Sequence, residues 1–275
     1  MKQYIYVILI AVFVAVLGTS TYFIIDYYKE ANKQAELYKE LASVVDKSET
    51  ENETAEPIQY SEEKTILPEL TELYQQNGDL VGWISVADTN INYPVMQSVN
   101  EPNFYLKHGF DKQYSDYGCP YVQEDCDVQK PSDNIVIYGH HMKNGSMFAH
   151  LEKFKDKDFW GEHRKITFNT LTDEQEYEIV AVFRTAVYTD SDDSFKYYRF
   201  VDAESTNDFD SYITKCKELS IYDTGVTAEY GDKLITLSTC EYSRTNGRLV
   251  VVAKLIAEDG GTDDSNTDTE TTAES

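Results

Sequence analysis

The chain has 275 residues, of which 49 are acidic and 24 basic, so its formal net charge is -25 at pH 7. This length accommodates one well-buried domain with accessory segments, and so strong a negative charge repels phosphate backbones, which argues against nucleic-acid binding. The four cysteines have no paired spacing, which fits neither a zinc ribbon nor a disulfide-rich scaffold, so we expect at least one free thiol.

The first predicted element is an apolar segment from Tyr4 to Ile25, 22 residues long and without a charge. A helix of that length crosses the hydrocarbon core of a bilayer. The apolar character continues to Asp26 without a small-residue cleavage site, so an uncleaved signal anchor at residues 1–28 is predicted. Lys2 and Lys29 flank the segment and partly offset each other, so charge alone leaves its orientation open.

Two polar segments flank the predicted domain. Residues 29–65 are predicted to form a polar helical stalk or linker, because Lys29 to Val45 has a helical composition and Asp46 to Glu63 is rich in Glu, Ser and Thr. Residues 259–275 are predicted to form an acidic, disordered tail, because Glu258 to Ser275 has seven acidic residues, no basic ones and almost no apolar side chains.

Residues 66–258 are predicted to form the compact domain, mainly β with added α-helices. It begins with an apolar helical stripe that stops at Asn77. Two later segments also have a helical pattern, Ser146 to Phe154 and roughly Asn207 to Leu219, and Cys216 falls on the apolar face of the second. Cys216 is therefore predicted to be a core residue.

Short runs rich in β-branched and aromatic residues indicate the strands of a barrel or sandwich. They are Leu80 to Val86, Ile91 to Val95, Asn134 to His140, Lys165 to Thr170, Glu176 to Ala186, Lys233 to Cys240 and Arg248 to Ala257.

One of these strands ends on a cysteine. Cys240 would present a thiol at a strand terminus where a peptide can reach it, a good position for a nucleophile, although a cysteine is also often a small buried hydrophobe. A turn at Asn246-Gly247 then starts the next strand at Arg248, and such a hairpin sets Arg248 across from Cys240. A guanidinium there can stabilise an oxyanion. Arg244 competes for this role, but it lies within the predicted loop.

A histidine ends another predicted strand. The segment from Asn134 runs through Gly139 into His140, and an imidazole transfers protons near neutral pH. A histidine at a strand end is also often a hydrogen-bonded surface residue, and the doublet His140-His141 could hold a metal. We expect no metal and no other cofactor.

Three blocks of sequence resemble the class B sortase family, the cysteine transpeptidases of Gram-positive bacteria. The blocks, which follow the family's order, are Tyr138-Gly-His-His-Met with Gly145-Ser-Met-Phe148, then Thr236-Leu-Ser-Thr-Cys240, then Arg248. The likeness covers roughly residues 67–257. It implies a closed eight-stranded β-barrel, preceded by an N-terminal transmembrane helix, with the active site at the ends of the strands that carry His and Cys.

Carried over residue by residue, the resemblance implies that Cys240 is the nucleophile, His140 the general acid and base, and Arg248 the oxyanion stabiliser, with Ser238 and Thr239 as candidates for binding substrate. The implied reaction cleaves a C-terminal sorting motif of a secreted protein after Thr, through a Cys thioester. The acceptor would be an amine of a peptidoglycan precursor or of a pilin. Such partners imply a single-pass protein of the cell membrane, with a cytoplasmic N-terminus and an extracellular catalytic domain.

Several alternatives stay open at this point. Cys119 and Cys126 are close enough in sequence for a loop disulfide outside the cell, or both are free. A membrane-tethered cysteine peptidase would resolve the same thioester with water. A non-catalytic surface module would bind peptides with Cys240 inert, and thiol reactivity would distinguish it from an enzyme.

Overall fold

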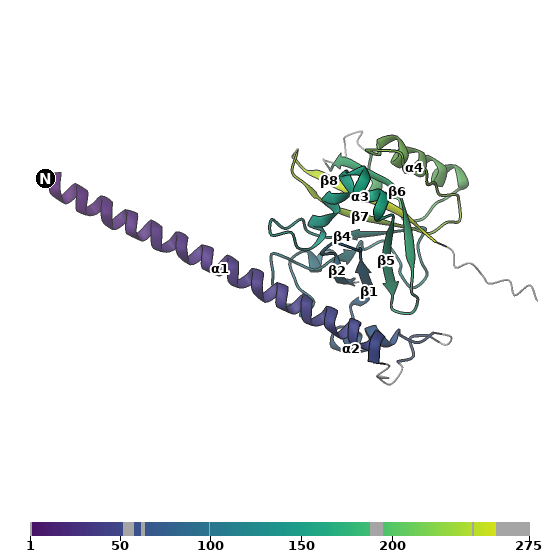
Figure 1. Ribbon diagram of the computed structural model, residues 1–275, viewed down its shortest axis with the longest axis horizontal. Coiled ribbons are helices and arrows are strands. Elements are labelled where there is room, and N and C mark those ends of the chain that lie inside the picture. The colour runs from purple at the N-terminus through teal and green to yellow at the C-terminus, as the bar shows by residue number, and fades with distance from the viewer. Residues whose placement is uncertain are drawn as a thin grey trace, which may run out of the picture.

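The structure is a computed structural model that describes residues 2–51, 58–61, 64–98, 100–187, 195–243 and 245–256. Figure 1 shows one long N-terminal helix leading to a domain built on strands. The predicted acidic tail at residues 259–275 and the competing Arg244 lie outside the described residues. The predicted domain limits at residues 28, 65 and 258 stay a prediction.

The long helix is α1 (Lys2–Glu51), a single element of 50 residues. Its first half makes no close packing with the domain: exposure runs from 76% at Tyr4 to 49% at Ile25. Among the described residues, α1 is the one helix long and apolar enough to cross a membrane. This is consistent with the predicted membrane anchor.

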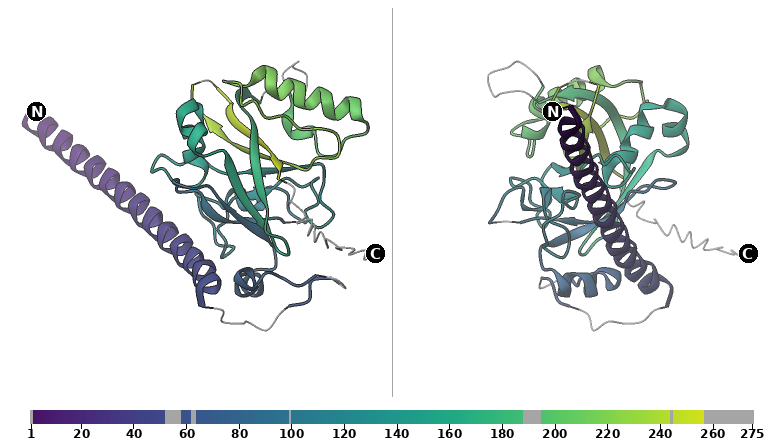
Figure 2. Two further views of the ribbon diagram at one scale, coloured as in Figure 1. Left: turned by 45° about the vertical axis from the view of Figure 1, so that its right-hand side comes forward. Right: turned by 90° about the vertical axis from the view of Figure 1, so that its left-hand side faces the viewer.

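The second half of α1 packs against the domain. Its buried side chains recur every three or four residues, which places them on one face of the helix; they are Ala31, Gln34, Tyr38, Leu41 and Val45. This face contacts α2 (Pro68–Gln76) and β2 (Asn92–Met96), and Figure 2 shows the end of α1 beside α2 at the base of the domain. A polar helical stalk or linker was predicted here; the helix forms, but one stripe of it is buried against the domain.

Eight strands in the described part of the chain close a barrel in the order β1-β2-β3-β4-β7-β8-β6-β5, so the predicted eight-stranded barrel is confirmed. Besides β2, the strands are β1 (Leu80–Ser85), β3 (Tyr121–Val122), β4 (Asn134–Tyr138), β5 (Lys165–Thr170), β6 (Glu176–Ala186), β7 (Leu234–Glu241) and β8 (Gly247–Leu255). Seven of them match the predicted runs closely. The strand that the sequence did not reveal is β3, whose two residues are too few to show a pattern.

Helices cover the barrel on opposite sides, with α2 at its base and α4 (Thr206–Leu219) at the far side (Figure 1). Ser205 caps α4 by accepting a hydrogen bond from the Asp208 N–H. Cys216 lies on the buried face of α4 and is itself fully buried, which confirms the predicted core position. The helix predicted at Ser146 to Phe154 is a 3-10 helix, η2 (Phe148–Lys155), which is followed by α3 (Lys157–Glu162). Two short 3-10 turns complete the set: η1 (Phe104–Leu106) and η3 (Tyr197–Arg199).

The pairing of β4, β7 and β8 decides where the chemistry-bearing residues lie. Strands β4 and β7 run parallel, from Asn134 opposite Leu234 to Tyr138 opposite Ser238. Strand β8 then returns antiparallel on the other side of β7. Because parallel strands end at the same edge, the residues that follow β4 and those that end β7 meet there.

Candidate active site

The hairpin of β7 and β8 brings the predicted nucleophile to the predicted oxyanion stabiliser. Asn246 has a positive φ of 54°, the left-handed conformation that Asn tolerates in tight turns. The turn sets the register so that Cys240 pairs with Arg248, which confirms the predicted juxtaposition. Cys240 and Arg248 are both partly exposed, whereas Gly247 and Leu249, the neighbours of Arg248 in β8, are buried. One Arg248 nitrogen donates to the Gly247 carbonyl at 2.9 Å, which restrains the guanidinium.

The predicted acid and base, His140, lies at the end of β4 beside β7. The Gly139 N–H donates to the Ser238 carbonyl at 3.1 Å and extends the parallel pairing by one residue. Only glycine fits here, because a Cβ on Gly139 would lie 2.5 Å from the Phe148 ring. The close packing at Gly139 therefore fixes the point at which the chain turns into His140.

The His140 ring has a defined hydrogen bond. Its Nε2 lies 2.7 Å from the Leu106 carbonyl oxygen. Because a carbonyl only accepts, Nε2 carries a proton, and Nδ1 is left for proton exchange. Burial lowers the pKa of His140 below its usual value and the nearby Lys107 lowers it further, whereas the bond to Leu106 and the charge of Asp116 act in the opposite direction.

All five predicted site residues line one cavity of about 470 Å³. His140, Cys240 and Arg248 lie in its wall, together with Ser238 and Thr239. Four tyrosines also line it, namely Tyr121, Tyr138, Tyr197 and Tyr198. These tyrosines were not predicted as site residues. The aromatic residues at positions 195–200 were a signal in the sequence for part of this wall, but no local pattern shows that they lie beside β7.

The hydroxyls of Ser238 and Thr239 already have partners within the protein. Tyr197 and Ser238 share a hydrogen bond of 2.6 Å between their hydroxyls. Thr239 donates to the Gly139 carbonyl at 2.8 Å. Both side chains are buried, and both join β7 to the neighbouring walls of the cavity. Their predicted role in binding substrate stays a prediction.

A buried charge network lies directly behind Cys240. The His141 Nδ1 donates to the Cys240 carbonyl at 3.0 Å, so the two histidines of the doublet bond different carbonyl groups. Glu241 is 5% exposed and lies 2.9 Å from the Lys155 ammonium. Burial would raise the pKa of Glu241, but hydrogen bonds from Ser243 and Lys155 outweigh it and hold the pKa at about 2.

The remaining cysteines are structural. Cys119, Cys126 and Cys216 are free and buried, so the loop disulfide that the spacing allowed is not formed. The thiols of Cys119 and Cys126 instead donate to the carbonyls of Pro94 and Asn134. Burial raises the pKa of Cys126 and Cys216 to about 12 and raises that of Cys119 still further. No cluster of three potential metal ligands occurs in the part of the chain that the structure describes.

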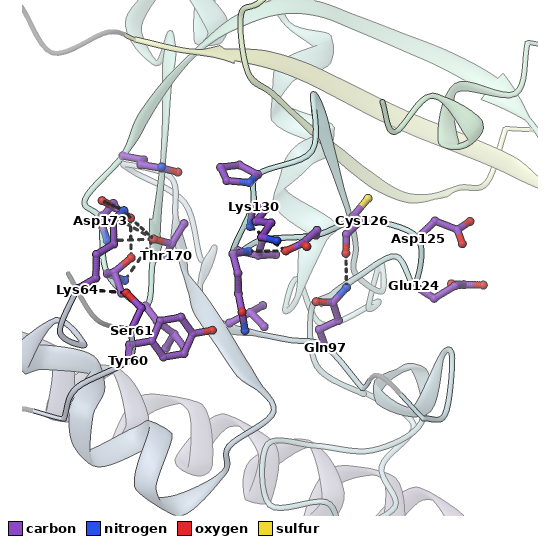
Figure 3. Close-up of a pocket in the computed structure, with 18 of the residues that line it drawn as sticks. Tyr60, Ser61, Lys64, Gln97, Glu124, Asp125, Cys126, Lys130, Thr170 and Asp173 are labelled. Atoms are coloured by element: carbon purple, nitrogen blue, oxygen red, sulfur yellow. Dashed lines mark hydrogen bonds and ion pairs between the residues drawn. The ribbon is translucent and has the colours of Figure 1, made fainter. Parts of the chain in front are cut away.

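A second cavity, of about 630 Å³, lies beside the first and shares Glu124 with it. Figure 3 shows its two facing walls: Lys64 pairs with Asp173 on one side at 2.7 Å, and Gln97 donates to the Cys126 carbonyl on the other at 2.8 Å. It is the larger of the two, but none of the five predicted site residues lines it. The chemistry therefore points to the cavity at Cys240.

Comparisons with known proteins agree with this geometry. A family model described as the sortase domain matches residues 84–256. Sortase B of Listeria monocytogenes is 36% identical over 192 residues, which is 69% of this chain and 75% of that protein. Sortase B of Staphylococcus aureus is 30% identical over 193 residues, 70% of this chain and 76% of that protein.

Solved structures give the same result for the fold. The S. aureus sortase B–substrate complex has a TM-score of 0.70 at 27% identity and covers 83% of this chain and 98% of its own. Sortase B from B. anthracis in complex with AAEK1 has a TM-score of 0.69 at 29% identity, covering 84% of this chain and 100% of its own. The chain therefore belongs to the sortase B family of cysteine transpeptidases.

Proposed function

We propose that this enzyme cleaves a C-terminal sorting motif of secreted proteins after threonine and transfers the acyl group to an amine of a cell-wall peptide. The observation that carries the proposal is the single cavity lined by Cys240, His140 and Arg248. Two related structures support it, since one sortase B is described as a substrate complex and another as complexed with triglycine.

The first half of the reaction forms a thioester. The Cys240 thiolate attacks the threonine carbonyl carbon, and Arg248 donates hydrogen bonds to the oxyanion that develops on the carbonyl oxygen. The carbon–nitrogen bond then breaks, and protonated His140 gives its proton to the leaving amine. Because Nε2 is bound to the Leu106 carbonyl, this proton comes from Nδ1.

The second half reverses these roles. The acceptor amine attacks the thioester carbonyl, neutral His140 takes the amine proton on Nδ1, and the Cys240 thiolate leaves as the new amide forms. Arg248 again faces the oxyanion, so one set of three side chains serves both steps. Ser238 and Thr239 contribute to the wall against which the peptide binds.

The tyrosines of the cavity suit an extended peptide. Tyr138 and Tyr198, which are partly exposed, offer flat apolar surface next to hydroxyl groups, a combination that binds both the side chains and the backbone of a peptide. Tyr197 is almost completely buried and bonded to Ser238. It therefore holds the wall of the cavity rather than moving on binding.

The exposed apolar half of α1 supports anchoring in the cell membrane. We propose that the N-terminus lies in the cytoplasm and the barrel outside, where secreted proteins and cell-wall peptides are found. Substrates and wall precursors that are themselves held at the membrane would then be presented to a tethered enzyme. Tethering raises the effective concentration of each partner. Peptidoglycan precursors and pilin amines are both acceptors that fit this placement.

The test uses the full chain in detergent micelles with a library of sorting-motif peptides and amine acceptors, and mass spectrometry to identify the products. The proposal predicts amide products with the wild type and with Cys126→Ala, a matched loss of a buried thiol, and none with Cys240→Ala. Hydrolysis products alone would favour a peptidase. Amide formation by Cys240→Ala would refute the thioester mechanism.

A further inference from the structure

The second half of α1, which packs against the domain, takes no part in the reaction steps at Cys240, His140 and Arg248. The helix continues unbroken from the apolar segment to the domain, and Tyr38 follows Ile25 by thirteen positions, which span about 20 Å at the rise of an α-helix. The buried stripe of α1 thus lies close to the end of the apolar segment. The residues of the domain that contact this stripe are therefore joined to the membrane anchor through one continuous helix.

Tyr38 makes the most specific contact of the stripe. It is 5% exposed, its ring packs edge-on against Tyr93 with centroids 5.3 Å apart, and its hydroxyl donates to the Gly118 carbonyl at 2.6 Å. Cys119, the residue after Gly118, lines the active-site cavity. One tyrosine of the anchor helix therefore reaches the rear of the cavity wall.

Gly118 and Cys119 are packed tightly against the end of η1. Gly118 has a φ of +58°, and a Cβ there would lie 2.5 Å from the Tyr105 carbonyl and 2.7 Å from the Leu106 carbonyl. The Cys119 N–H donates to the Tyr105 carbonyl at 2.9 Å. The backbone that Tyr38 holds is therefore in direct contact with the Leu106 carbonyl.

The Leu106 carbonyl is the group that accepts the hydrogen bond from His140 Nε2 at 2.7 Å. The same segment, residues 104–119, which we call the histidine loop, also carries the two charges that act on His140. They are Lys107 and Asp116, which form an ion pair at 2.7 Å. The orientation and the electrostatic surroundings of His140 thus both depend on how this loop is held.

We propose that Tyr38 is a positioning residue for the transpeptidation, which clamps the histidine loop from the anchor helix and so holds the Leu106 carbonyl in place for His140. The inference rests on the proposed role of His140 as acid and base. It makes the docked half of α1 part of the catalytic apparatus as well as part of the tether. Tyr38 itself touches neither substrate nor the reacting atoms.

Tyr38→Phe is the direct test, because it removes the hydroxyl and keeps the ring that packs against Tyr93. Tyr74→Phe is the matched control: Tyr74 is partly buried on α2, its ring packs edge-on against Tyr60, and its hydroxyl has no hydrogen-bond partner among the described residues. Both variants are made in the full chain and studied in detergent micelles. The first readout is kcat/KM for transpeptidation. The second is the titration of His140, measured by NMR with labelled histidine; the chain has five histidines.

We expect Tyr38→Phe to reduce kcat/KM by about tenfold, the effect of misplacing one hydrogen-bonded catalytic group. The pKa of His140 should fall as well, since the bond to Leu106 raises it. Tyr74→Phe should leave both quantities unchanged. A Tyr38→Phe enzyme with a lower melting temperature but an unchanged kcat/KM and His140 titration would reduce Tyr38 to a packing residue and overturn the inference.

Failure of the proposed function has a different signature. If the wild type forms no amide product with any peptide and amine, transpeptidation by this chain is refuted, while the His140 titration still reports on the clamp. A His140 pKa equal in Tyr38→Phe and wild type would then overturn the coupling, and a fall confined to Tyr38→Phe would support it.

Discussion

Glu241→Gln removes the buried charge that directly follows the nucleophile. The carboxylate is 4% exposed and paired with Lys155 at 2.9 Å, and the pKa of Glu241 lies at about 2 against a usual 4.5. A difference of this size corresponds to roughly 3 kcal/mol of stability at neutral pH. The Lys155 side chain is 26% exposed, so solvent screens the pair in part and reduces this figure. We therefore expect Glu241→Gln to lower the free energy of unfolding at pH 7 by about 2–3 kcal/mol.

The pH dependence follows from the direction of the shift. Because folding depresses the pKa of Glu241, its contribution is complete above the unfolded value and is lost as the pH falls from about 4.5 towards 2. Urea unfolding of a fragment that begins at Lys29, and so keeps the docked half of α1, would measure it. The difference between wild type and Glu241→Gln should shrink through that window.

A matched control comes from an exposed ion pair. Glu176 pairs with Lys165 at 2.6 Å, but both side chains are about half exposed, so Glu176→Gln should change stability by less than about 0.5 kcal/mol. The reasoning would be refuted if Glu241→Gln cost no more than Glu176→Gln. It would also be refuted by a cost that is the same at pH 7 and pH 3.

Three further predictions concern the site and the loop behind it. Arg248→Lys keeps the charge but loses the planar set of donors, so kcat/KM for transpeptidation should fall by about 100-fold or more in steady-state assays. Gly118→Ala places a Cβ 2.5 Å from the Tyr105 carbonyl at a positive φ, and should lower the free energy of unfolding by about 2–3 kcal/mol in urea titrations. Iodoacetamide should add one label to the folded chain, on Cys240, because the other three cysteines are buried; intact mass would show it, with four labels after unfolding.

The parts of the site predicted from sequence are those set by local chain geometry. The pairing of Cys240 with Arg248 follows from a short turn at Asn246, whose conformation fixes the register of both strands. The meeting of His140 with Cys240 has a different origin. It depends on parallel pairing between strands about 100 residues apart, which no local pattern specifies, and it was expected from the family resemblance.

Two features escaped prediction for a common physical reason. The tyrosines of the cavity and the buried stripe of α1 are defined by their partners in space. Tyr38 is one apolar position in a polar helix, and its importance depends on the Gly118 carbonyl, 80 residues further along the chain. A narrow buried stripe in a charged helix resembles a solvated helix until the surface that covers it is known.

The geometry of the site follows from the need to satisfy backbone groups where the strands end. Strand β4 stops at Tyr138 while β7 continues to Glu241, so the Cys240 carbonyl has no partner in β4, and His141 supplies one at 3.0 Å. The Gly139 carbonyl is likewise satisfied by the Thr239 hydroxyl at 2.8 Å. Buried carbonyls need such partners for stability, and here the partners also fix the nucleophile and the histidine. Substitutions at these side chains should therefore reduce stability and activity together.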